Sequence, residues 1–281
     1  MGLDLHSAQF LLHQKRRGVR FGRVLTLGRQ GIYMPGRLYQ GYLKTLGVSQ
    51  EQPDYADDFF RGLGATSIDF MDASNYEGAN VVHDLNQPIP SKFAEAYDCV
   101  FDGGALEHVF NFPTALKNCM AMVRPGGHLI LITTWNNYAG HGFYQFSPEL
   151  FYSALSVENG YAVEEMLIVQ RNRWYAVANP GEVGGRIELI NAEPTLLFLT
   201  ARRLESKPVF STWPQQSDYS ARWAAGNASP TQPSATRGFK ETWLKKSAAL
   251  RSLQRRWQAR KHRKSCSVSN RKNFQPVDLA D

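Results

Sequence analysis

The chain has 281 residues, of which 43% are hydrophobic and 20% charged, and its mean hydropathy is −0.39. This composition suits one large domain with an appendage, and no apolar run approaches the roughly 18 residues that a membrane span needs. The formal net charge of +7 is uneven, because residues 1–236 are mildly acidic while residues 237–281 carry 13 Lys or Arg against 3 Asp or Glu.

The first segment, residues 3–17, predicts a short amphipathic helix. Its basic residues follow its apolar ones, which is the reverse of a signal peptide, and His6 stands where the myristoylation pattern needs Ser or Thr. The three cysteines, Cys99, Cys119 and Cys266, lack CxxC spacing. Cysteines without this spacing are typical of reduced thiols in a cytoplasmic protein, which is what the sequence predicts.

Strands and a helix follow in alternation. Apolar runs at 23–27 and 67–71 are typical of buried strands, and Pro35 opens a helix that continues to Leu46. A short strand is predicted at 81–82. Only about seven residues separate it from the preceding strand, which is too few for a full crossover helix.

Residues 97–134 predict a complete βαβ unit. The apolar run at 99–101 stops at Asp102, as a buried strand does where it meets a loop. Apolar residues at i, i+4 and i+7 from Leu116 indicate a helix, which ends at a basic residue followed by Pro-Gly-Gly. Residues 128–132 are again apolar, so a second strand parallel to the first is expected.

The C-terminal part of the sequence predicts three regions. Strands at 161–169 and 195–200 complete a domain over residues 1–204. Pro, Ser, Gln, Ala and Thr dominate residues 205–238, which predicts a disordered linker. Residues 239–281 predict a basic amphipathic helix and tail. The apolar stripe of this helix consists of Trp243, Leu250, Leu253 and Trp257.

The run YDCVFDGGALEHV, followed by ALKNCMAMVRPGGHLILIT, resembles the second half of a class I S-adenosylmethionine-dependent methyltransferase domain. The resemblance implies an α/β, Rossmann-like fold with a doubly wound, mostly parallel sheet of seven strands, the last two antiparallel. It also implies S-adenosylmethionine as the cofactor. One departure concerns the family's acid-x-Gly-x-Gly-x-Gly loop, in which only the first glycine, Gly28, is in place here.

A mostly parallel sheet binds its ligand at the carboxyl ends of its strands. The resemblance therefore implies an acid for the ribose hydroxyls after the second strand, one for the adenine amino group after the third, and one beneath the sulfonium after the fourth. Turn-forming roles for the same residues stay open. The candidate cofactor-binding residues are Gly28, Arg29, Gln30, Asp72, Asp84, Leu85, Asp102 and Gly103.

Two histidines are candidate catalytic bases. His141 lies between two glycines in the loop after the last central strand, 136–144, where relatives place groups that contact the substrate. His108 is the second candidate, and a neutral histidine can take a proton from a hydroxyl. Some relatives hold a divalent metal with a pair such as Glu107 and His108, but a single pair is not a metal site, and none is predicted.

The predicted function is methyl transfer from S-adenosylmethionine to a hydroxyl or carboxyl of a small molecule or saccharide. The degenerate glycine loop leaves open a methyltransferase-like module that binds a partner without catalysis. Nucleic-acid methylation is disfavoured, because the sequence lacks both an Asn-Pro-Pro-aromatic motif and a Pro-Cys pair. The basic tail suits a solvated extension, a helix on an anionic membrane surface, or a nucleic-acid-binding segment.

Overall fold

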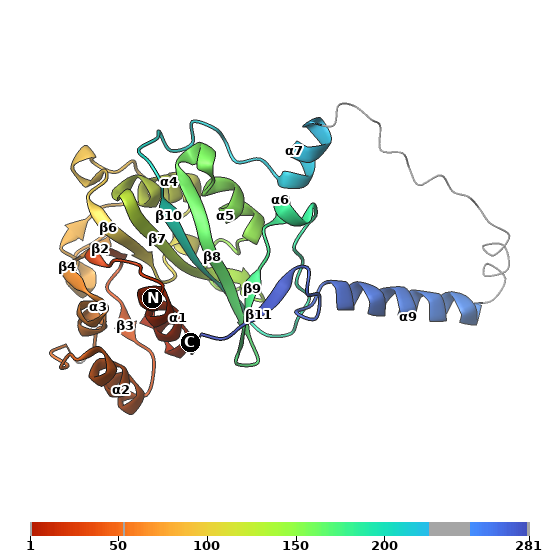
Figure 1. Cartoon of the computed structure of the whole chain (residues 1–281), viewed down its shortest axis with the longest axis horizontal. Coiled ribbons are helices and arrows are strands. Elements are labelled where there is room, and N and C mark those ends of the chain that lie inside the picture. Colours follow the sequence, from red (N-terminus) through yellow and green to blue (C-terminus); the bar gives the residue numbers. More distant parts are fainter. Residues whose placement is uncertain (1, 53, 225–247, 280–281) are drawn as a thin grey trace.

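The structure, a computed structural model of the chain, describes residues 2–52, 54–224 and 248–279 (Figure 1). Its strands are β1 (Gly2–Leu3), β2 (Gly22–Leu27), β3 (Gly31–Ile32), β4 (Ala65–Asp72), β5 (Val81–Val82), β6 (Tyr97–Asp102), β7 (Val123–Asn136), β8 (Tyr161–Gln170), β9 (Arg173–Val177), β10 (Thr195–Arg203) and β11 (Phe274–Val277). Its α-helices are α1 (Leu5–Arg16), α2 (Gly36–Leu46), α3 (Asp57–Leu63), α4 (Phe112–Met122), α5 (Pro148–Ala154), α6 (Pro180–Val183), α7 (Ser217–Ala224) and α9 (Ala248–Ser265). Short 3₁₀ turns lie at Tyr76–Gly78, Ser91–Phe93, Leu106–His108 and Val157–Asn159.

The large sheet has the strand order β11-β9-β8-β10-β7-β6-β2-β4-β5. From β5 to β7 every neighbouring pair is parallel. Read in that direction and renumbered along the chain from 1 to 5, these five strands have the order 3-2-1-4-5. That is the order of doubly wound folds, with the reversal of strand order between β2 and β6. The predicted doubly wound α/β fold is confirmed, with β10 antiparallel to both β7 and β8.

Within the described part of the chain nine strands build this sheet, whereas seven were predicted. β9 forms a hairpin with β8, and β11 pairs antiparallel with β9 at the sheet edge. The hairpin turns at Arg171 and Asn172, which both have positive φ, as in a type I′ turn. Because neither residue is glycine, the turn carries no strong sequence signal, and β9 was not predicted.

β11 also contradicts the predicted boundary of the domain at residue 204. Phe274 is fully buried, with its ring 6.2 Å from that of Trp135 on β7. Val209 and Phe210 are buried as well. The segments on both sides of the basic helix therefore pack against the domain, because each contributes apolar side chains to its core.

The predicted linker and tail are described only in part. Residues 225–247, including Trp243, lie outside the described residues. The segment 205–224 ends in α7, and α9 covers most of the predicted basic helix. Figure 1 shows α9 (blue) extending away from the sheet, and Trp257 on it is 63% exposed.

Alternation along the central strands produces two apolar layers. On β6 and β7, Val100 and Leu129 belong to the cluster that includes α4 and α5 side chains. Phe101 and Ile130 belong to the opposite cluster, which includes side chains of α1, α2 and α3. The sheet is therefore buried on both faces, and its carboxyl edge is left for loops.

Local signals set the start of several helices. Asp4 caps α1, because its Oδ1 accepts a hydrogen bond from Ser7 N at 2.7 Å. Pro113 and Pro148 occupy the first turns of α4 and α5, where the missing amide hydrogen costs nothing.

Among the helices that the structure describes, none is both long and apolar enough to cross a membrane.

The packing of β11 predicts the effect of one core substitution. Phe274→Ala should lower the free energy of unfolding by about 3 kcal/mol, because it leaves a cavity beneath the edge of the sheet. The exposed Trp257→Ala is the matched control and should change it by less than about 0.5 kcal/mol. Denaturant unfolding of both variants measures the difference, and equal stabilities would mean that β11 does not belong to the folded sheet.

Candidate functional site

The carboxyl ends of the parallel strands meet at the point where strand order reverses. In the sheet register, Leu27 of β2 lies opposite Met71 of β4 on one side and Asp102 of β6 on the other. The following residues, Gly28 and Gly103, are therefore neighbours at this edge. A crevice between two such strand ends is where doubly wound folds bind their ligands.

Gln30 occupies this reversal point. Its Nε2 donates hydrogen bonds to the carbonyl oxygens of Leu27 (2.9 Å) and Gly28 (3.1 Å), and the side chain is only 2% exposed. The Oε1 atom lies against Gly103, so closely that a Cβ at Gly103 would collide with it. This Oε1 is buried without a hydrogen-bond partner among the described residues, which is a costly arrangement for a polar atom.

Arg29 is held by residues from two other elements. Its Nη2 lies 2.6 Å from Oδ2 of Asp57 at the start of α3, and the hydrogen bond to Asp57 raises the pKa of Arg29. The guanidinium stacks 4.1 Å from the ring centre of Tyr55 and 5.0 Å from that of Phe70. Asp57 and Tyr55 were not predicted as site residues, because their approach to Arg29 depends on tertiary packing.

The two outer acids differ in how far they are engaged. Asp72, at the end of β4, is half-buried and accepts a hydrogen bond from Ser74 N at 3.2 Å. Asp84 is exposed, and hydrogen bonds from the backbone and side chain of Asn86 lower its pKa. Leu85 packs in the core on the α4 side. Of these predicted residues, Asp72 offers the carboxylate that is least committed to its own turn.

Asp102 is fully buried and shapes the turn after β6. Its Oδ1 accepts a hydrogen bond from Ala105 N at 2.7 Å, and its Oδ2 accepts one from Leu106 N at 3.4 Å. Burial, and then the nearby Glu107, raise the pKa of Asp102 to about 8. A charged acid was predicted at this position. Burial instead favours the neutral form of the Asp102 carboxyl group, and its hydrogen bonds fix the backbone of the turn.

Glu107 connects three segments at the same edge. Its side chain is 1% exposed, and Oε2 accepts a hydrogen bond from Thr133 Oγ1 of β7 at 2.8 Å. Its carbonyl oxygen accepts hydrogen bonds from Phe143 N (2.8 Å) and Tyr144 N (3.3 Å). The main-chain carbonyl of Glu107 thus ties the loop after β7 to the turn after β6, while its buried carboxylate binds β7 itself.

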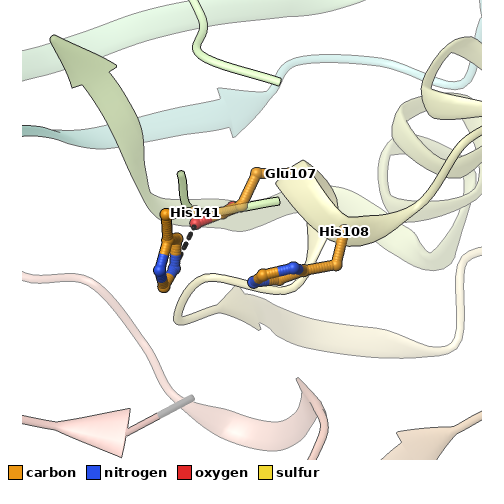
Figure 2. A group of neighbouring side chains, drawn as sticks. All are labelled: Glu107, His108 and His141. Atoms are coloured by element: carbon orange, nitrogen blue, oxygen red, sulfur yellow. Dashed lines mark ion pairs between the residues drawn. The ribbon is translucent and has the colours of Figure 1, made fainter. Parts of the chain in front are cut away.

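Both predicted histidines lie near this carboxylate, and His141 forms the ion pair with it that Figure 2 marks. His141 Nε2 lies 3.9 Å from Glu107 Oε1, and the rings of His108 and His141 are 5.0 Å apart. His141 is about half exposed, so its ring faces solvent while Glu107 is enclosed. Ligand atoms of the three side chains lie within 4.8 Å of one another. The group can act as a carboxylate–histidine pair in proton transfer, or offer one oxygen and two nitrogens to a cation.

A cavity of about 270 Å³ opens beside these three side chains. Gly103, Gly104 and Tyr138 line one side, and the N-terminal residues Gly2 and Asp4 line another. β1 reaches this position because it pairs with β3 directly after the Gly28 turn. Strands of two residues have no readable periodicity, so the part played by the N-terminus was not predicted.

Two asparagines anchor the predicted substrate loop to the segment before β10. The Nδ2 atoms of Asn136 and Asn137 each lie 2.8 Å from Oδ1 of Asn191. Gly142 then allows the loop to approach the turn after β6. Its φ is +89°, and a Cβ there would lie 2.8 Å from the Glu107 carbonyl oxygen and 3.0 Å from His108 Nδ1.

No protein-family model matches the chain, and no curated protein matches it in sequence. Solved structures that resemble it include the Burkholderia thailandensis 1,6-didemethyltoxoflavin-N1-methyltransferase with bound 1,6-didemethyltoxoflavin and S-adenosylhomocysteine, at 16% identity over 70% of this chain and 77% of that one, with a TM-score of 0.42. The N-methyltransferase NodS from Bradyrhizobium japonicum WM9 is 13% identical over 71% of this chain and 96% of that one, with a TM-score of 0.43.

A third similar structure is the branched-chain polyamine synthase from Thermus thermophilus in complex with N4-aminopropylspermidine and 5′-methylthioadenosine. It is 13% identical over 74% of this chain and 60% of that one, with a TM-score of 0.36. All three structures are below 25% identical to this chain, with TM-scores below 0.5. The strand order of the chain itself establishes the fold.

Because the backbone approaches other residues closely at Gly142, an alanine substitution there should destabilise the protein more than one at Gly140. Gly142→Ala should lower the free energy of unfolding by more than about 1 kcal/mol, since alanine is strained at this φ and its methyl group would press on Glu107 and His108. Gly140→Ala is the matched control, because a Cβ there meets nothing within 4 Å. Thermal unfolding compares the two variants, and equal losses would contradict the packing described for the loop.

Proposed function

We propose that the protein is an S-adenosylmethionine-dependent methyltransferase that acts on a hydroxyl group of a small molecule or saccharide. The observation that carries the proposal is the buried Glu107 facing the half-exposed His141 at the carboxyl edge of β6 and β7. This pair lies in one cavity with Gly103, next to the reversal of strand order.

The residues at the reversal point suit the cofactor. The Oε1 of Gln30, which has no hydrogen-bond partner among the described residues and packs against Gly103, would accept a hydrogen bond from the methionyl ammonium group. Asp72 would accept from the ribose hydroxyls, since a charged acceptor forms the stronger hydrogen bonds. When bound, S-adenosylmethionine supplies an electrophilic methyl group on a sulfonium.

His141 would remove the proton of the acceptor hydroxyl. Glu107 would orient the ring and place a negative charge near it, as the carboxylate does in other carboxylate–histidine pairs. A carboxyl acceptor is already ionised near pH 7 and needs no base, so the pair favours a hydroxyl. Asp4, Glu107 and both histidines line the cavity, and this polar lining suits a saccharide or another polar acceptor.

One observation supports a second candidate, a binding module without methyl transfer. Gln30 stands in place of the second glycine of the family's loop and bonds the end of β2, and Arg29 is held by Asp57. Whether or not the protein transfers methyl groups, the exposed basic residues of α9, together with Trp257, would favour binding to an anionic surface. An anionic membrane suits the exposed tryptophan better than a nucleic acid would.

Asp72 provides the first test. Calorimetry should detect binding of S-adenosylhomocysteine to the wild-type protein, and Asp72→Asn should weaken it about 10- to 100-fold through loss of charge-assisted hydrogen bonds. Asp69→Asn is the control, because Asp69 lies on the same strand but binds Arg23 and Tyr97. No binding to the wild type would exclude the enzyme and leave the binding module.

His141 provides the second test, in a methyl-transfer assay on a panel of hydroxylated acceptors. His141→Gln should reduce turnover by about 10² to 10⁴ while the affinity for S-adenosylhomocysteine stays unchanged, because a general base acts only on the acceptor. His108→Gln should cost less. Turnover within a few-fold of wild type in His141→Gln would show that this histidine is not the base.

A further inference from the structure

A second group of potential metal ligands shares no residue with the site described above. Glu188 belongs to the segment between α6 and β10, and His262 and Cys266 lie at the carboxyl end of α9. Cys266 Sγ is 3.3 Å from Glu188 Oε2 and 3.6 Å from His262 Nδ1. Ligand atoms of all three lie within 4.8 Å of one another. We propose that these three residues bind a zinc ion.

The distances between the donor atoms suit a tetrahedral ion. With bonds of about 2.3 Å to sulfur and about 2.0–2.1 Å to nitrogen or oxygen, two ligands of tetrahedral zinc lie about 3.6 Å apart. The two separations from Cys266 Sγ are close to this value without any movement of the backbone. His262 and Cys266 are four residues apart at a helix end, so both side chains project from the same face.

The donor chemistry also selects zinc. A thiolate, an imidazole and a carboxylate are its usual protein ligands, whereas calcium and magnesium prefer oxygen alone. Cys266 is 3% exposed while Glu188 and His262 are exposed, so an ion enters from solvent and keeps its fourth position for water. On binding, the thiol proton now directed at Glu188 is released to solvent and a zinc–sulfur bond replaces the S–H bond.

Electrostatics at the end of α9 permit this ion despite the basic residues of the helix. The Cys266 thiolate and the Glu188 carboxylate together offset the two positive charges of zinc, so the occupied site has no net charge of its own beside Arg263 and Lys264. The carbonyl groups at a helix carboxyl terminus favour a cation.

The site would join two parts of the chain that are distant in sequence. Ile190 N already donates a hydrogen bond to Cys266 O at 2.7 Å, and Leu189 O accepts one from Asn136 Nδ2 at 3.1 Å. Zinc would therefore fasten α9 to the same segment that supports Asn136. Zinc binding by these residues does not depend on the proposed methyl transfer.

Cobalt substitution tests the site in the full chain, because a cobalt–thiolate bond produces a charge-transfer band in the near ultraviolet. The wild-type protein should bind about one equivalent of zinc at this site and show the band with cobalt. Cys266→Ser should abolish the band, and His262→Gln, at an exposed position that does not threaten folding, should weaken cobalt binding by about 100-fold.

Two controls separate this site from the rest of the molecule. Cys119→Ala removes a buried thiol elsewhere and should keep the band. His141→Gln disables the Glu107–His108–His141 group, which contains no sulfur, and should keep it as well. Absence of the band in the wild type, or its persistence in Cys266→Ser, would overturn the proposal.

Discussion

The buried carboxylate of Glu107 is the constraint on which the arrangement of the candidate site depends. A carboxyl group that is only 1% exposed is costly to bury unless hydrogen bonds satisfy it, and Thr133 on β7 supplies one. The main-chain oxygen of the same residue holds the loop that carries His141. One residue therefore sets both the position and the electrostatic surroundings of the imidazole.

The elements that could be predicted from sequence are those whose signals are local. The βαβ unit around Asp102 was predicted because its apolar runs, helix and Pro-Gly-Gly stop are contiguous, and the strand ends at Gly28 and Asp72 were found the same way. Contacts between distant segments were not. The pairing of Arg29 with Asp57, the docking of Phe274, and the N-terminal residues in the cavity depend on packing that no short pattern records.

The two halves of the carboxyl edge have different characters. On the side of β6 and β7, glycines and polar side chains line an open cavity. On the side of β2 and β4, Gln30 and Arg29 fill the space with side chains that other residues hold in place. At the boundary, Oε1 of Gln30 is buried without a hydrogen-bond partner among the described residues, which favours a ligand that donates a hydrogen bond to it.

Amide hydrogen exchange with and without S-adenosylhomocysteine tests most directly whether that boundary is a binding site. The account predicts slower exchange at residues 28–32 and 103–108, on both sides of the reversal point, and unchanged exchange in α7. Unchanged exchange at residues 28–32 and 103–108 with the ligand at millimolar concentration would contradict it.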